Sequence, residues 1–162
     1  MRYRYTGPAD IAARSRHHPA GTPAGSAADI RAWLAATDPR DRRDPFTYVI
    51  TIDGVLLLAP RRSEHVACAA GADVLAAGEI TFTPDGGVSA VTNQSTGYCP
   101  QPCCWPAVDA ALNRAGIAHP GAFTSAFVFR HCTVCTHLNV IKDDVYVCAH
   151  CDTDLPPTLR KS

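Results

Sequence analysis

The sequence predicts an α+β fold in which an antiparallel sheet carries one or two packed helices and is followed by a C-terminal metal-stabilised ribbon. Three observations support this class: two hairpin signals between residues 46 and 93, one well-patterned helix near residue 110, and two C-x2-C pairs close to the C-terminus. A chain of 162 residues that is 46% hydrophobic can form one ordinary core plus a small metal-stabilised module.

The sheet is predicted from a change of hydrophobic period at residue 46. From Phe46 to Ile52 large apolar residues alternate with threonine or valine, and Asp53-Gly54 is a strong two-residue hairpin signal before the apolar run 55–58. A second hairpin is expected from segments 78–83 and 88–92. Residues 67–77 are expected to form a loop or a short helix between the two hairpins.

Two helices are expected. Ser26 can cap the first one, which carries Ile30, Trp33 and Leu34 on one face and should end before Pro39. The second covers residues 106–115, with proline in the first turn and Gly116 at the position of a C-cap. We expect this second helix to cover one face of the sheet.

The strongest motif is a pair of cysteine knuckles with the pattern C-x2-C-x12-C-x2-C. Its members are Cys132, Cys135, Cys148 and Cys151. Two intervening residues let both sulfurs of a pair point at one ion, and the twelve residues between the pairs can form a hairpin of segments 138–141 and 145–147. Four thiolates favour a tetrahedral, redox-silent ion, so the motif predicts a zinc ribbon that binds one structural Zn²⁺.

Three alternatives remain open for this motif. Iron in a rubredoxin-like site is the less favoured occupant. Two disulfides would satisfy the same four sulfurs, although paired C-x2-C motifs are more often metal ligands in a reducing cytosol. His131, His137 or His150 could replace one cysteine ligand, although neighbouring histidines are more often only exposed residues.

Charge and composition exclude some functional classes. The 15 basic and 15 acidic residues cancel, which argues against a general nucleic-acid binder but not against a local contact. No run approaches the ~18 apolar residues of a membrane span, and no signal peptide is evident, so we expect a cytoplasmic protein. The excess of arginine over lysine, with abundant alanine and proline, is typical of GC-rich bacterial genomes.

The other four cysteines are Cys68, Cys99, Cys103 and Cys104. Buried thiols that act as small apolar side chains are the favoured interpretation. A second metal site from Cys99, Cys103 and His65, or a reactive thiol, are the alternatives. A cytidine-deaminase site is excluded because that chemistry needs H-x-E and P-C-x-x-C, whereas residue 67 is alanine and Cys103 and Cys104 are adjacent.

Residues 61–100 resemble the central block of plant IQ-motif calmodulin-binding proteins and related bacterial domains. That block reads roughly H-S-S-F, A-A-G and S-G-H-Y-x-P. The matching positions are His65, Ala76-Ala77-Gly78, Ser95, Tyr98 and Pro100. Val66-Ala67-Cys68 replaces S-S-F, Thr96-Gly97 replaces G-H, and no IQ helix is present, so calmodulin binding does not carry over. The chain also looks like small actinobacterial proteins that end in a zinc ribbon.

The same segment supplies the candidate catalytic residues His65, Glu79, Ser95 and Tyr98, and Asn93 as a candidate cofactor-binding residue. A histidine and a glutamate could act as general base and orienting group, while the others hydrogen-bond a ligand. A His–Tyr–Glu set invites comparison with ADP-ribosyltransferase-type NAD sites, by analogy of fold alone. The alternative is that these residues are a solvent-facing strand residue, a hydrogen-bonded turn and a satisfied loop histidine.

We expect an N-terminal helical or irregular segment (1–45), an α+β domain (46–122), the zinc ribbon (123–155) and a tail (156–162). Two functional hypotheses follow. In the favoured one, the protein is a non-enzymatic adaptor or regulator whose ribbon recognises a protein or nucleic acid. In the other, the central segment is an enzyme or nucleotide site, and the ribbon completes the fold.

Overall fold

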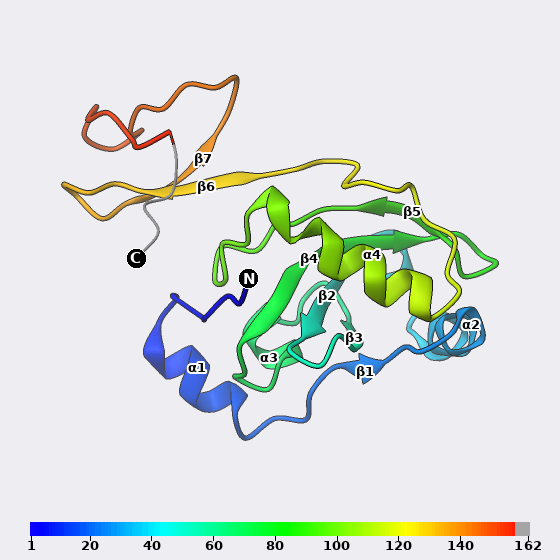
Figure 1. Ribbon diagram of the computed structural model, residues 1–162. Coiled ribbons are helices and arrows are strands. Elements are labelled where there is room, and N and C mark those ends of the chain that lie inside the picture. The colour runs from blue at the N-terminus through cyan, green and yellow to red at the C-terminus, as the bar shows by residue number, and fades with distance from the viewer. Residues whose placement is uncertain (158–162) are drawn as a thin grey trace.

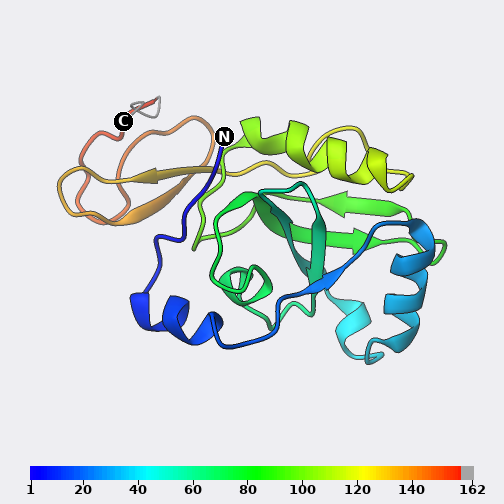
Figure 2. The same ribbon diagram turned by 60° about the horizontal axis from the view of Figure 1, so that its bottom comes forward.

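The computed structural model describes residues 1–157 and confirms the α+β class (Figure 1). An antiparallel five-stranded sheet has the order β1-β3-β2-β4-β5, and a separate antiparallel sheet pairs β6 with β7. Both views show the small sheet projecting to one side of the larger one (Figures 1 and 2). Residues 158–162 of the expected tail lie outside the described part of the chain.

The strands are β1 (Thr22–Pro23), β2 (Phe46–Thr51), β3 (Leu56–Ala59), β4 (Val74–Phe82), β5 (Val88–Val91), β6 (Val128–His131) and β7 (Leu138–Ile141). The α-helices are α1 (Ala9–Ser15), α2 (Ala27–Ala36), α3 (His65–Cys68) and α4 (Trp105–Arg114). Two short 3₁₀ helices are η1 (Asp41–Arg43) and η2 (Pro102–Cys104).

Both expected hairpins are present in the large sheet, although the first turn contains three residues, 52–54, and not the predicted two, since the N–H of Thr51 donates to the carbonyl oxygen of Val55. β2 and β3 are joined through Gly54, whose φ of 79° is the left-handed conformation that a tight hairpin turn requires. β4 and β5 are joined through Gly86, with φ of 91°. The strand order places β2 at the centre, so its two neighbours come from the two hairpins.

Strand β4 begins at Val74, four residues before the predicted segment 78–83. The expectation of a loop or short helix over residues 67–77 was therefore only partly correct, because Ala76 and Ala77 pair with β2. Gly78 lies where a Cβ atom would be 2.0 Å from the carbonyl oxygen of Thr92. The close approach of this backbone explains why glycine occupies the position.

Helices cover both faces of the central strand. α4 contacts β2, β3 and β4, while α3 contacts β2 and β3, and Figure 2 shows α4 above the large sheet with α1 and α3 below it. All residues from Phe46 to Ile50 are buried, including Thr47 and Val49. The alternation in the sequence therefore does not separate a core face from a solvent face.

Helix α2 begins as predicted. Ser26 caps it by accepting a hydrogen bond from the backbone N–H of Asp29 at 3.1 Å, and the helix ends before Pro39. The N-terminal segment also contributes to the core, since Ile30 is fully buried and Tyr3 forms an isolated bridge with Val74. The short helix α1 was not predicted, because its sequence has no clear apolar stripe.

The ribbon hairpin differs from the expected one, because segment 138–141 (β7) pairs with β6 and residues 145–147 form no strand. Residues 145–147 form only isolated bridges, one from Lys142 to Val145 and one from Val147 to Asp154. Asp143 and Asp144 both have positive φ, which is the conformation of a tight two-residue turn after β7. Pairing ends soon after this turn because the chain bends into the second cysteine pair at Cys148.

Candidate metal centre and the pocket beside it

Four cysteine side chains converge at the end of the two-stranded sheet. The Sγ atoms of Cys132, Cys135, Cys148 and Cys151 all lie within 4.8 Å of one another. Two of these separations are 3.5 and 3.6 Å, whereas a disulfide bond is about 2.05 Å long, so the disulfide alternative is wrong. Metal–sulfur bonds of about 2.3 Å give a tetrahedron with edges of about 3.8 Å, and the two separations of 3.5 and 3.6 Å are close to this value.

The two cysteine pairs adopt the same backbone turn. In each, the N–H of the first cysteine donates to the carbonyl five residues later, and the N–H four residues later donates to the first cysteine's carbonyl, at 2.8–3.0 Å. The residue after the second cysteine is left-handed in both turns, with φ of 63° at Thr136 and 57° at Asp152. The repeated geometry presents two sulfurs from each side.

Hydrogen bonds to the cysteine sulfurs favour the thiolate form in this cluster. Cys132 Sγ accepts from the backbone N–H groups of Val134 and Cys135, at 3.4 and 3.5 Å. Partial positive charge at these donors stabilises a thiolate, which is the form that binds a metal.

Cys148 shows this effect most clearly. Burial opposes its ionisation, but hydrogen bonds from the backbone N–H groups of His150 and Cys151 and from the side-chain amide of Asn139 lower the pKa of Cys148 to about 6. The amide oxygen of Asn139 in turn accepts from the N–H of Ala149 at 2.9 Å. Asn139, buried on β7, therefore links the first strand pair to the second knuckle.

The cluster can hold one metal ion, and its donor set is closed. Four protein sulfurs fill a tetrahedron, so no position remains for water or substrate. The three neighbouring histidines are exposed and are not members of the cluster. The rings of His137 and His150 stack on each other with centroids 5.3 Å apart, and His131 Nδ1 lies 3.4 Å from the carbonyl oxygen of Thr136.

The side-chain amide of Asn93 joins the ribbon to the large sheet. Its nitrogen donates to the carbonyl oxygens of Pro100 and Phe127, and its oxygen accepts from the N–H of Phe127, all at 2.7 Å. Asn93 is fully buried and gives Phe127 both bonds that a neighbouring strand would give. The amide proposed for cofactor binding is thus fully engaged with the backbone.

Gln101 and Arg130 form a second link between the two regions. Gln101 Nε2 donates to the carbonyl oxygen of Phe129 at 3.3 Å, and Arg130 Nη1 donates to Gln101 Oε1 at 2.8 Å. Arg130 also donates to the carbonyl oxygens of Phe129, Pro156 and Pro157. Neither residue is predicted from the sequence. For Arg130 the available signal is a charged residue inside an otherwise apolar strand.

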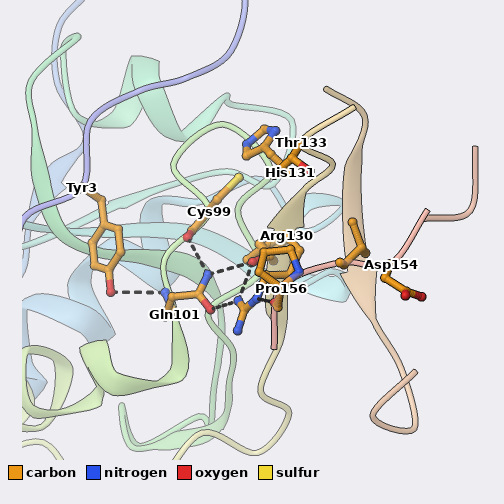
Figure 3. Close-up of a pocket in the computed structure, with 10 residues that line it drawn as sticks. Tyr3, Cys99, Gln101, Arg130, His131, Thr133, Asp154 and Pro156 are labelled. Atoms are coloured by element: carbon orange, nitrogen blue, oxygen red, sulfur yellow. Dashed lines mark hydrogen bonds between the residues drawn. The ribbon is translucent and has the colours of Figure 1, made fainter. Parts of the chain in front are cut away.

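A cavity of about 720 Å³ lies between the ribbon and the core segments that contain Tyr3 and residues 99–101 (Figure 3). Tyr3, Cys99 and Gln101 line it from the core, and Arg130, His131 and Asp154 from the ribbon. Its remaining lining consists of Phe129, Thr133, Leu155 and Pro156. None of the catalytic candidates lines this cavity.

Two of the four catalytic candidates share a different and smaller pocket. His65 and Glu79 line a cavity of about 220 Å³, where Glu79 lies 3.6 Å from the Arg61 guanidinium. His65 Nε2 is 2.9 Å from the carbonyl oxygen of Gly78. Burial lowers the pKa of His65, although that hydrogen bond and the charges of Glu79 and Glu64 oppose the effect.

The structure places Ser95 and Tyr98 elsewhere. Tyr98 is buried, donates its hydroxyl hydrogen to the carbonyl oxygen of Ala72 at 2.6 Å and packs edge-on against Tyr5. Burial raises the pKa of Tyr98 above its ordinary range. Ser95 Oγ is buried without a hydrogen-bond partner among the described residues. Neither side chain lines the pocket of His65 and Glu79.

Most of the other cysteines behave as protonated thiols. Burial raises the pKa of Cys68 and Cys104 to about 12 and that of Cys99 to about 11, so all three are neutral near pH 7. Cys103 is exposed. Within residues 1–157 no second group of three or more His, Cys, Asp or Glu side chains converges as the four ribbon cysteines do.

Over residues 1–157, every helix falls short of the length and apolar character that crossing a bilayer demands. Comparison of the chain with models of known protein families, with curated proteins and with solved structures found no match. The resemblances of residues 61–100 and of the whole chain therefore stay predictions from the sequence.

Proposed function

We propose that this chain is a zinc-binding, non-enzymatic adaptor or regulatory protein whose ribbon is a rigid recognition module for another protein. The observation that carries the proposal is the closed cluster of four cysteine sulfurs, all within 4.8 Å of one another. Zn²⁺ suits this donor set because it accepts a tetrahedral thiolate shell without redox chemistry. A filled shell stabilises structure and offers no reactive position.

The surface of the ribbon supports a role in recognition. Seven large apolar side chains are exposed in the described chain, and four of them belong to the ribbon. They are Val134, Val140, Val145 and Val147. A module of this size gains nothing for its own fold from exposed valines, whereas a protein partner can bury them.

Charge favours a protein over a nucleic acid as this partner. Residues 123–157 carry two cations, Arg130 and Lys142, against the four carboxylates of Asp143, Asp144, Asp152 and Asp154. Arg130 is buried, and four thiolates around one Zn²⁺ add further negative charge. Phosphate backbones are bound by clusters of exposed lysine and arginine, and Lys142 is the one exposed residue of this kind within residues 123–157.

The enzyme or nucleotide hypothesis has less support. The pocket of His65 and Glu79, at about 220 Å³, is smaller than the about 300–1,000 Å³ of typical small-molecule sites. Ser95, Tyr98 and Asn93 do not extend it. Hydrogen bonds within the protein already engage Tyr98 and Asn93.

The test combines metal analysis with a surface variant. Protein purified without added chelator should contain one zinc per chain by plasma mass spectrometry, and Cys132→Ser should abolish this. A Val145→Asp/Val147→Asp variant should keep its zinc but lose the proteins that cross-link to the wild-type ribbon in cell extract. Ile52→Asp, an exposed apolar position on the core, is the matched control that should keep them.

Two results would overturn the proposal. One is purified protein without stoichiometric zinc. The other is tight binding of labelled single- or double-stranded oligonucleotides by the zinc-loaded protein at physiological salt, which the acidic ribbon is expected not to show.

A further inference from the structure

The cavity between core and ribbon has the size and lining of a ligand site. Its volume of about 720 Å³ falls within the about 300–1,000 Å³ usual for small-molecule pockets. Two regions that are distant in sequence form it, with Tyr3, Cys99 and Gln101 facing Arg130 and His131 in Figure 3. Sites at the junction of two structural units are common for ligands.

Arg130 makes this cavity unusual. Its residue surface is 6% exposed, and it forms no salt bridge with residues 1–157. Its partners are the carbonyl oxygens of Phe129, Pro156 and Pro157 and the amide oxygen of Gln101, with the Tyr146 ring 5.8 Å from its guanidinium carbon. The hydrogen-bond acceptors of Arg130 within residues 1–157 are all neutral, so they fix the guanidinium in place without pairing its positive charge with a carboxylate.

The four hydrogen bonds of Arg130 occupy Nε, both hydrogens of Nη1 and one hydrogen of Nη2. One N–H of Nη2 is thus free in the described structure to meet a ligand. We infer that the cavity binds an organic anion, a carboxylate attached to an apolar body, and that Arg130 is its charge-recognising residue.

The rest of the lining matches such a ligand. The hydroxyls of Tyr3 and Thr133 can donate hydrogen bonds to carboxylate oxygens. Phe129, Leu155 and Pro156 form the apolar wall. The site is independent of the partner surface in the proposed function, although it needs a folded ribbon.

Among the described residues, Asp154 is the only acidic side chain that lines the cavity. It is exposed on the ribbon side of the cavity, and Figure 3 shows its carboxylate directed away from Arg130. Water and salt screen a carboxylate in this position, so it weakens anion binding without preventing it. Removing its charge should therefore strengthen binding, which gives the proposal a gain-of-affinity test.

The experiment titrates zinc-loaded full-length protein with 3-phenylpropionate and follows amide resonances by ¹H–¹⁵N NMR at constant ionic strength. The neutral probe 3-phenylpropanamide has the same shape and is the control ligand. We expect saturable shifts at residues 129–133 and 154–156, a dissociation constant of about 1 mM or below, and at least tenfold weaker binding of the amide.

Three variants then test whether Arg130 recognises the negative charge of the ligand. Arg130→Gln should weaken binding of the acid at least tenfold, and Asp154→Asn should strengthen it about threefold at low salt. Thr133→Trp, at an exposed lining position, should block the cavity while leaving every hydrogen bond of Arg130 in place. If Arg130→Gln fails to fold, the other two variants still decide, and zinc analysis of each sample shows whether the ribbon is intact.

A comparison with peptides distinguishes a peptide C-terminus from a small organic acid as the source of the carboxylate. Gly-Gly-Phe with a free C-terminus is compared with its C-terminal amide and with the free acid probe. Tighter binding of the peptide acid identifies a peptide C-terminus as the ligand, and tighter binding of 3-phenylpropionate identifies a small acid. Absence of saturable shifts with either acid, equal binding of acid and amide, or an Asp154→Asn variant that binds more weakly would overturn the inference, whatever the metal content.

Discussion

The large sheet and the ribbon obtain their stability in opposite ways. Within residues 1–157, twenty-six buried apolar side chains form one cluster around the large sheet, whereas the ribbon cluster has three, and two of those are the cysteines Cys132 and Cys148 of the candidate metal site. Hydrophobic burial of the first kind supports an independent fold. The ribbon resembles small metal-dependent modules, in which binding free energy replaces a core.

The junction between the large sheet and the ribbon is stabilised differently from either region. Asn93, Gln101 and Arg130 connect them mainly through hydrogen bonds between buried polar side chains and backbone carbonyls. Such groups contribute modestly when every partner is present and are costly when one is removed. A polar junction therefore fixes the orientation of the ribbon, and it also forms the wall of the cavity in Figure 3.

The largest expected effect is loss of the metal. Structural zinc contributes on the order of 10–16 kcal/mol to small modules near neutral pH, so Cys148→Ser should unfold residues 123–157 while the large sheet stays folded. NMR spectra should show dispersed core resonances and collapsed ribbon resonances. The exposed Cys103→Ser is the matched control and should leave both regions unchanged.

The converse variant weakens the core. Leu112 is fully buried on α4, so Leu112→Ala should lower the unfolding free energy of the core by about 2–5 kcal/mol. Urea unfolding measures this loss, and the zinc content should stay unchanged. The two regions would prove to be one cooperative unit if Cys148→Ser unfolded the large sheet as well.

The junction should show an intermediate effect. Asn93→Ala leaves the N–H and carbonyl groups of Phe127 and the carbonyl of Pro100 without their partner, so we expect a loss of about 3 kcal/mol in unfolding free energy. Faster hydrogen exchange at Phe127 should accompany it. Gln94→Ala, at the exposed neighbouring position, should change the free energy by no more than about 0.5 kcal/mol.

A smaller, pH-dependent effect is expected at His65. Burial lowers its pKa in the folded state, so the unfolded chain binds the proton first as pH falls below the ordinary histidine value of about 6.5. The neutral histidine therefore favours folding above that pH, and the advantage is lost below it, with a slope of at most about 1.4 kcal/mol per pH unit.

Urea unfolding of the core between pH 7.5 and 5.5 measures this effect. His65→Gln, which keeps a donor for the Gly78 carbonyl, should show a shallower decline than wild type. The exposed His18→Gln should follow wild type. Identical slopes in all three proteins would contradict the assignment.

The sequence predicted local features well and the junction poorly. The Ser26 cap, the Asp53-Gly54 hairpin and the cysteine spacing each depend on a few neighbouring residues, and the structure confirms all three. The early start of β4 was missed because Ala76 and Ala77 have weak strand propensity and are held by pairing with β2. Pairing with β2, and not local propensity, therefore sets the start of β4.

The candidate site shows the same limit. His65, at the start of α3, and Glu79, on β4, line the same pocket. Asn93 and Tyr98 have the same polar chemistry, but they are engaged with the backbone at positions 127 and 72, which lie on distant segments. Spacing along the chain does not reveal which polar side chains form hydrogen bonds inside the protein and which can face a ligand.

The smallest expected effect concerns the first knuckle and is a gain. Thr136 has φ of 63°, a conformation that costs a residue with a branched Cβ about 1–2 kcal/mol and that glycine adopts freely. Thr136→Gly should therefore raise zinc affinity about fivefold in a competition with a chromophoric chelator, because ribbon folding and zinc binding are coupled. Thr133→Gly, in the same knuckle without positive φ, should weaken zinc binding slightly through its greater unfolded-state entropy. If both glycine variants lost affinity, the left-handed turn would not limit the stability of the ribbon, and the hydrogen bond from the Thr136 hydroxyl to the Cys135 carbonyl at 2.7 Å would be the more important contribution at this position.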